Sequence, residues 1–135
     1  MSSATLTTTH KRTVEQANDA FVRNDIEAFL NLCTENIEWT MVGDTTVRGK
    51  SAVREWMKSM DPGTPAVTVD RIIAEADFAV TWGSLTMKDK DGRAAPFTYC
   101  DVYRFQGDRI ATLKGVRHQD RAAGREVALT CGEDA

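Results

Sequence analysis

The sequence predicts an α+β fold, in which N-terminal helices cover one face of a sheet formed by the second half of the chain. Residues at helical spacing dominate positions 13–32, and a further helix is expected at 52–60, whereas β-branched and aromatic residues dominate positions 66–118. Short turn signals separate the later runs, and closely spaced strands with short connections form an antiparallel meander. At 135 residues, the chain is one domain by length.

Two helices are expected in the segment 13–32, where apolar residues recur at helical spacing with a break at Asn24 and Asp25. Thr13 begins a capping box for the first helix, and the side chain of Asp25 caps the second. Residues 1–12 are mostly polar, and we expect them to form a flexible N-terminal segment.

A strand and a third helix are expected next. The stretch "NIEWTMVGD" at 36–44 is typical of a strand, and Ser51 caps a helix over 52–60 that the Pro- and Gly-containing segment 61–65 ends. Four further strands are expected at 66–77, 78–88, 95–105 and 109–118. The tail that follows them has weak patterning and receives no assigned structure.

The composition argues against several classes of function. A net charge of −3 and a pI near 5.4 give no basic surplus for binding nucleic acid. No apolar run approaches the roughly 20 residues of a membrane span, so we expect a cytoplasmic protein without a membrane partner. Three cysteines without a CxxC pair, and only two histidines, favour reduced thiols over a zinc site. Since nucleotide-binding and zinc-protease motifs are also missing, we expect no metal and no cofactor.

An acid interrupts the apolar pattern of the strand at 95–105. Alternate residues of a strand point to the same face of the sheet. The residues that share a face with Asp101 are Phe97, Tyr99, Tyr103 and Phe105. If this face is buried, the charged carboxylate is costly, so Asp101 is paired, protonated or kept for chemistry.

The other face of the same strand carries a mixed set of side chains. They are Thr98, Cys100, Val102 and Arg104. Since the helices cover only one face of the sheet, this face is either solvated or covered by a partner. The mixed character suits a subunit interface, and we therefore expect a homodimer through the outer face of the sheet.

The register of the last hairpin decides what faces Asp101. A two-residue turn at 107–108 places Lys114 directly opposite, and the resulting ion pair lowers the pKa of Asp101. A three-residue loop at 106–108 places Leu113 opposite instead, and desolvation then raises this pKa. Both registers are compatible with the sequence.

Three stretches resemble the SnoaL-like polyketide cyclase and ketosteroid isomerase branch of the nuclear transport factor 2-like superfamily. They are "VEQANDAFVRNDIEAFLNLCTENIEWTMVGD", "VRGKSAVREWM" and "YCDVYRFQGDRIATLKGV". The resemblance defines a domain over 13–118 and implies a cystatin-like fold, in which a cone-shaped, curved antiparallel sheet wraps around three N-terminal helices. It leaves the tail 119–135 either covering a pocket or disordered.

The resemblance also implies a deep, mostly apolar pocket that binds a small apolar ligand. The residues that would line it are Thr40, Trp56, Val80, Trp82, Tyr99, Asp101, Leu113 and Arg117, the last beside Asp101 at the pocket mouth. Asp101 resembles the pocket acid that ketosteroid isomerases keep protonated and cyclases use as a general acid and base. The resemblance favours the register that places Leu113 opposite Asp101.

Departures from the family pattern reduce the number of reactions expected for this chain. The isomerase's general base falls at Thr40 and its oxyanion tyrosine at Ala17, so classical steroid isomerisation is not expected. The arginine and two aspartates of limonene epoxide hydrolase have no clear counterpart, and His118 is a lone histidine.

Two functions remain. In the first, Asp101 is the acid and base of a cofactor-independent enzyme that isomerises, cyclises or hydrates a small hydrophobic carbonyl compound. In the second, the chain is a non-catalytic module that binds a small ligand or serves as a dimeric scaffold.

Overall fold

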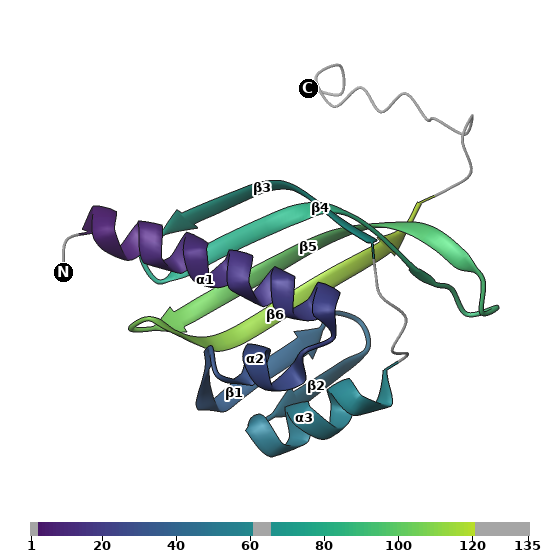
Figure 1. The fold of residues 1–135 in the computed structure, drawn as a ribbon, viewed down its shortest axis with the longest axis horizontal. Helices are drawn as coiled ribbons and strands as arrows, with labels where there is room; N and C mark the ends of the chain where they lie inside the picture. The colour runs from purple at the N-terminus through teal and green to yellow at the C-terminus, as the bar shows by residue number, and fades with distance from the viewer. Residues whose placement is uncertain (1–2, 61–65, 121–135) are drawn as a thin grey trace.

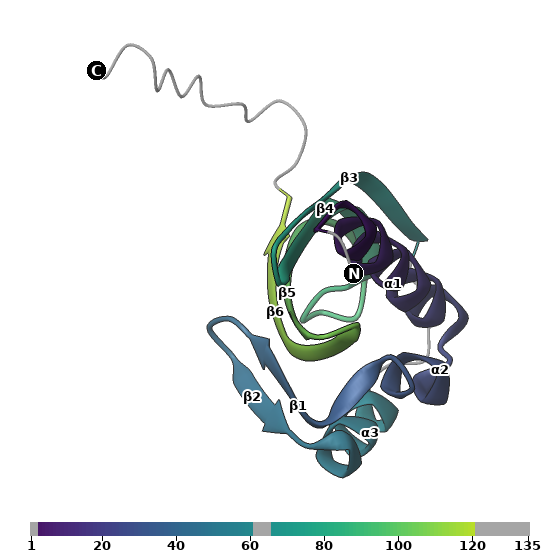
Figure 2. The same cartoon turned by 90° about the vertical axis from the view of Figure 1, so that its left-hand side faces the viewer.

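A six-stranded sheet that curls around the first helix forms the frame of the molecule (Figures 1 and 2). The computed structural model describes residues 3–60 and 66–120. The elements are α1 (Ser3–Arg23), α2 (Ile26–Leu30), β1 (Cys33–Met41), β2 (Thr45–Arg48), α3 (Lys50–Ser59), β3 (Ala66–Glu75), β4 (Phe78–Lys88), β5 (Ala94–Gln106) and β6 (Arg109–Gln119). The α+β class and the curved sheet are confirmed: α1 lies in the concave side against β3 and β4, while α2 and α3 lie beside β1 (Figure 2).

The sheet is mixed, whereas the sequence predicts an antiparallel one. The strand order is β2-β1-β6-β5-β4-β3, and β1 runs parallel to β6. Hairpins correctly predict that β3, β4, β5 and β6 are antiparallel neighbours. Residues 42–108 separate β1 from β6, however, so no hairpin sets the relative direction of these two strands. The short strand β2 pairs with β1 and lies in a stretch where no strand is predicted.

Helix α1 begins at Ser3, ten residues before its predicted start at Thr13, so the expectation of a flexible segment over 1–12 is wrong for residues 3–12. The Thr13 hydroxyl donates to a carbonyl one turn earlier, 3.0 Å away, and caps nothing. His10 is fully buried, stacks on Phe105 with 4.0 Å between ring centroids, and places its Nε2 atom 2.8 Å from the Gly107 carbonyl. This tertiary contact holds the first turns of the helix against the β5–β6 turn.

The helix ends follow the sequence in one case and depart from it in another. Asn24 takes a positive φ of 54° between α1 and α2, and Asp25 accepts a hydrogen bond from the Ala28 amide, as predicted. The predicted cap at Ser51 is wrong, because α3 already begins at Lys50. It follows Gly49, whose φ of 89° no side chain tolerates well.

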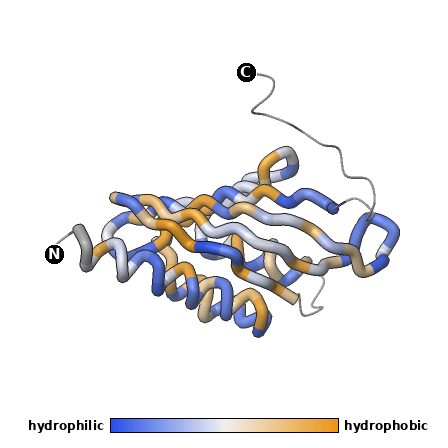
Figure 3. Tube along the Cα trace, turned by 90° about the horizontal axis from the view of Figure 1, so that it is seen from above, coloured by the Kyte–Doolittle hydropathy of each residue, from blue (hydrophilic) through white to orange (hydrophobic). Residues whose placement is uncertain are grey.

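Aromatic rings from α1, α2, α3 and β1 form the core between the helices and the sheet. Phe21, Phe29 and Trp39 lie within 4.8–5.5 Å of one another, and Trp56 of α3 meets the Trp39 ring edge-on at 4.8 Å. Away from this core, the chain becomes hydrophilic at the hairpin between β4 and β5 (Figure 3). The buried volume is therefore concentrated at the helix-covered side of the sheet.

The outer face of the sheet exposes apolar side chains. Ile73 and Val116 are each 46% exposed there, beside half-buried Val80, Trp82 and Val102. The homodimer through this face stays a prediction. The role of the tail also stays a prediction, because the tail lies outside the described residues from residue 121. The segment 61–65, which is predicted to end α3, lies outside them too. None of the helices in the described ranges is long and apolar enough to cross a membrane.

Replacing His10 with alanine is expected to destabilise the fold by about 2–4 kcal/mol, because it removes a buried ring and its contact with the β5–β6 turn. Urea unfolding measures the change. Lys11→Ala is the matched control, since Lys11 is exposed on the same helix and its loss costs less than about 0.5 kcal/mol. Equal effects of the two substitutions would mean that the first turns of α1 contribute nothing.

Candidate functional site

Asp101 lies at the centre of the concave face of the sheet. It is 2% exposed and is the one buried carboxylate among the described residues. Thr81 of β4 and Gly115 of β6 lie directly opposite it on the two flanking strands. Tyr99 and Tyr103 share its face of β5, and both are buried, as the alternation of that strand predicts.

The register of β6 differs from both predicted registers. The turn has two residues, since Gln106 pairs with Arg109, but Ala111 is an extra residue that bulges out between the pairs Phe105–Ile110 and Arg104–Thr112. The bulge shifts the rest of β6 by one position. Gly115 therefore faces Asp101, and neither Lys114 nor Leu113 does.

Arg117 reaches Asp101 diagonally across the two strands. Its Nη1 atom donates to Oδ1 at 2.6 Å, and its Nη2 atom lies 3.5 Å from Oδ2. The guanidinium also lies over the Tyr99 ring, 5.4 Å from the ring centroid. The pairing depends on Gly115, because a Cβ atom there would lie 2.9 Å from Oδ1 of Asp101 and 3.3 Å from Nη1 of Arg117.

Two opposing effects set the protonation of Asp101. Burial raises the pKa of its carboxyl above the ordinary value of 3.8, and the charge and hydrogen bond of Arg117 offset part of that rise. The net pKa stays raised, since desolvation is the larger effect. Asp101 is thus both desolvated and ion-paired, whereas each of the two predicted registers implies only one of these states.

Four polar groups on the same concave face have no hydrogen-bond partner among the described residues. They are Trp39 Nε1, Thr81 Oγ1, Tyr99 OH and Tyr103 OH. Burial raises the pKa of both tyrosines; Thr81 offsets part of the rise at Tyr99, although the geometry of the two hydroxyls falls short of a regular hydrogen bond. Both tyrosines are therefore neutral donors. Buried polar groups normally have partners, so these groups are candidates to bind the oxygen atoms of a ligand.

Three of the predicted pocket residues lie on the opposite face of the sheet. Thr81 faces inward with Asp101, so its neighbours Val80 and Trp82 point outward, where they pair with Val102 and Cys100. Thr40 likewise alternates with the buried Trp39, and its hydroxyl lies 3.0 Å from that of Thr46. The predictions for Thr40, Val80 and Trp82 are therefore wrong.

The large apolar residues of β4 do not mark its inner face, because only small side chains fit there. The inward residues are Ala79, Thr81 and Gly83, which lie under α1 and against β3. A Cβ atom at Gly83 would lie 1.9 Å from the Thr68 carbonyl oxygen, so the neighbouring backbone occupies the side-chain space. The larger residues of this strand consequently face outward.

The remaining predicted residues lie on the inner side with Asp101. Arg117 contacts Asp101 directly, and the Tyr99 ring lies under the Arg117 guanidinium. Leu113 is buried on β6, directly opposite Trp39 on one neighbouring strand and Tyr103 on the other. Trp56 packs on Trp39 from α3 and is partly buried.

Trp39, Thr81 and Gly115 are absent from the predicted site. They point inward because of which alternate residues of β1 and β4 face the helices and because of the bulge in β6, and the hydrophobic pattern reveals neither. His118 is exposed, and no group of metal-ligating side chains gathers within the described ranges.

A family model described as a SnoaL-like domain matches residues 14–113. The chain belongs to this family. A search of the curated proteins found no match. The resemblance to SnoaL-like proteins is confirmed, and the family includes cyclases, isomerases and epoxide hydrolases.

Solved structures confirm the fold of the SnoaL-like chain. An NTF2-like protein of unknown function from Cytophaga hutchinsonii is 28% identical over 80% of this chain and 98% of its own, with a TM-score of 0.67. A LEH-like epoxide hydrolase of M. tuberculosis is 20% identical over 82% and 84%, with a TM-score of 0.72. SalBIII, an epoxide hydrolase/cyclase-like enzyme of pyran ring formation in polyether salinomycin, is 18% identical over 80% and 89%, with a TM-score of 0.71.

Replacing Arg117 with glutamine is expected to raise the pKa of Asp101. Arg117 is the group that offsets burial, so its removal leaves the desolvated carboxylate without a counter-charge. An NMR titration of the Asp101 carboxyl carbon measures the pKa in both proteins. Arg104→Gln is the matched control, because Arg104 is exposed on the opposite face of β5. A pKa in R117Q at or below that of the wild type would contradict the pairing.

Replacing Gly115 with alanine is expected to separate Asp101 from Arg117, because the added methyl group would occupy the space in which the two side chains meet. Overpacking of this kind costs about 1–3 kcal/mol of stability. Thermal unfolding and the Asp101 carboxyl titration measure the two effects, and the pKa is expected to rise as the pair opens. Val116→Ala, at the exposed neighbouring position, should change neither quantity; an unchanged pKa in G115A would show that the glycine is not required.

Proposed function

We propose that this SnoaL-like protein is a cofactor-independent enzyme in which Asp101 moves a proton on a small, apolar carbonyl compound. The observation that carries the proposal is a buried carboxylate held by Arg117, close to buried hydroxyl groups that have no hydrogen-bond partner among the described residues. A carboxylate whose pKa is raised above its ordinary value is a stronger base than an exposed one and also a useful acid.

The proposed step uses Asp101 first as a base and then as an acid. The carboxylate takes a proton from the carbon next to the substrate carbonyl, and the bond's electrons move onto the carbonyl oxygen. Arg117 and the Tyr99 hydroxyl stabilise the negative charge that develops there. In a substrate with a double bond between its β- and γ-carbons, the resulting dienolate accepts the proton back at the γ-carbon, which is an isomerisation. Otherwise the enolate attacks a second carbonyl, which closes a ring and leaves an alkoxide that accepts the proton.

Arg117 also controls access to the acid in this proposal. Its side chain is 19% exposed while that of Asp101 is 3% exposed, so the guanidinium is the outer member of the pair. A substrate oxygen meets the arginine first and shares its donors with the carboxylate. Five donors in a planar fork allow one guanidinium to serve both partners.

The names of two similar structures support acid and base chemistry in this family without assigning the substrate. One is an epoxide hydrolase and the other an epoxide hydrolase/cyclase-like enzyme. The proposed reaction for this chain differs from hydrolysis, because only one carboxylate is buried in the described part of the protein.

A second candidate function is ligand binding without chemistry. The observation that favours it is the occupied state of Asp101, whose Oδ1 atom already accepts a 2.6 Å hydrogen bond from Arg117. If the Asp101–Arg117 pair never opens, it only links β5 to β6, and the unpartnered hydroxyl groups remain to bind a ligand. In that case, the acid has a structural role.

Replacing Asp101 with asparagine is expected to lower the rate of α-proton exchange of carbonyl compounds by about 10²–10⁴-fold, because the amide cannot accept the proton. Exchange in deuterated water followed by NMR measures the rate, and circular dichroism checks the fold. Asp44→Asn is the matched control, since Asp44 is exposed in the turn after β1.

The binding function predicts a different outcome from the same measurement. Neither the wild type nor D101N would then exchange any compound, while both would bind the same one. Exchange that survives unchanged in D101N would remove Asp101 from the mechanism.

A further inference from the structure

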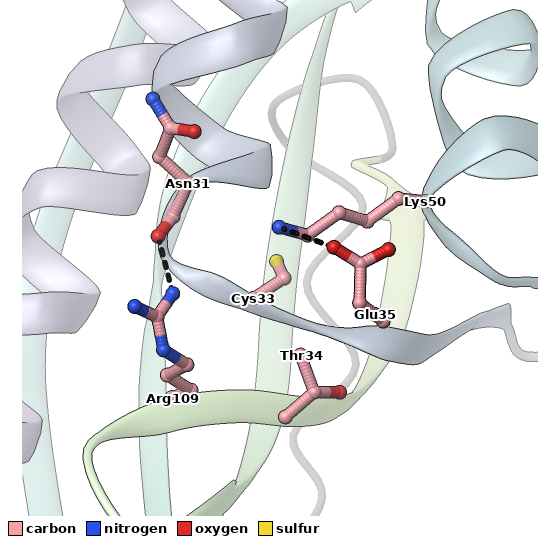
Figure 4. A pocket seen from close by; sticks show the side chains of 6 residues that line it. All are labelled: Asn31, Cys33, Thr34, Glu35, Lys50 and Arg109. Carbon is pink, nitrogen blue, oxygen red and sulfur yellow. Dashed lines mark hydrogen bonds and ion pairs between the residues drawn. The ribbon is translucent and has the colours of Figure 1, made fainter.

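A polar hollow opens where the first strand leaves the sheet (Figure 4). Its volume is about 490 Å³, within the range of small-molecule sites. The lining residues are Asn31, Cys33, Thr34, Glu35, Lys50 and Arg109, which come from the end of α2, β1, the start of α3 and the start of β6. Asp101 lies opposite Gly115, which is six residues from Arg109 on β6, so about 20 Å separate the two sites along the strand.

An irregular strand pairing creates the hollow. β1 pairs with β6 at Cys33–Ile110 and again at Glu38–Thr112, so four residues of β1 lie opposite a single residue of β6. The backbone of β1 therefore bends away from β6 between the two pairs. The hollow is built into the sheet and does not depend on a loop.

Two cations from different elements line the hollow. The Lys50 side chain is 19% exposed and its Nζ atom lies 3.6 Å from Oε1 of Glu35, whose own side chain is 84% exposed. Arg109 uses Nη1 to donate to the Asn31 carbonyl at 3.0 Å, which leaves its other donors for a ligand. The lysine is thus held in place while the carboxylate opposite it is free to turn into solvent.

Both cations act electrostatically on the buried thiol of Cys33. Lys50 and Arg109 each lower its pKa, although burial is the larger effect and raises the pKa to about 12. The Sγ atom donates to the Phe29 carbonyl at 3.3 Å. Cys33 is therefore a neutral wall of the hollow and no nucleophile, and the positive field of the two cations is left for another anion.

We propose that this hollow binds a small molecule through a phosphate or carboxylate group, which Lys50 and Arg109 hold while Glu35 turns outward. The arginine supplies planar donors and the lysine a point charge, a combination suited to an oxyanion. Thr34 also lines the hollow. The proposal is independent of the chemistry at Asp101.

An NMR titration with inorganic phosphate, at ionic strength held constant with sodium chloride, tests the site. The amide signals of Thr34 and Glu35 are expected to shift and saturate. Lys50→Gln and Arg109→Gln should each weaken binding about tenfold, because each removes a charge-assisted hydrogen bond. Glu35→Gln should tighten binding, because it removes the competing carboxylate; a purely structural ion pair predicts no gain.

Two controls complete the experiment. Lys58→Gln removes an exposed lysine of the same helix and should leave phosphate binding unchanged, and Arg109→Lys keeps the charge where glutamine disturbs folding. Phenyl phosphate and benzoate at matched ionic strength then tell the two anion classes apart. Shifts that do not saturate, that persist in the K50Q and R109Q variants, or that weaken in E35Q would overturn the proposal.

Discussion

The bulge at Ala111 is the constraint on which the concave face depends. Side chains alternate along β6, so one extra residue decides which half of them points inward. With the bulge, Leu113, Gly115 and Arg117 face the helices; without it, Lys114 and Val116 would. The same residue therefore places an arginine beside the buried acid and sends a lysine into solvent, where Lys114 is exposed.

Small residues on both neighbouring strands make room for a charge at the centre of the sheet. Asp101 lies between Thr81 and Gly115, and neither fills the space above the carboxylate. Arg117 occupies that space from the side, with its guanidinium over Tyr99. Larger neighbours would have buried the acid in hydrocarbon without a counter-charge, at a cost that a domain of this size can hardly offset.

The sequence predicts the positions of most helices and strands, but for some strands it does not predict which side chains face inward. The break at Asn24, the Asp25 cap and the inward face of β5 follow from local patterns, because each depends on residues close together in the chain. The inward face of β4 does not, since it is set by backbone that approaches Gly83 from β3. The site is correspondingly half predicted: Tyr99, Asp101, Leu113 and Arg117 lie on the inner face, whereas Trp39 and Thr81 take the places expected for Thr40, Val80 and Trp82.

Among the residues that the structure describes, only one carboxylate is buried, and this restricts the chemistry that the proposed enzyme can perform. Hydrolysis needs one group to activate water while another protonates the leaving oxygen, and the tyrosines are poor proton donors because burial raises their pKa values. In isomerisation or ring closure the same proton is first removed and then returned, so one acid suffices. Burial raises the pKa of Asp101 above its ordinary value and Arg117 offsets part of that rise, and a raised pKa favours the uptake of a proton in such a cycle. Isomerases and cyclases therefore fit this concave face better than epoxide hydrolases do.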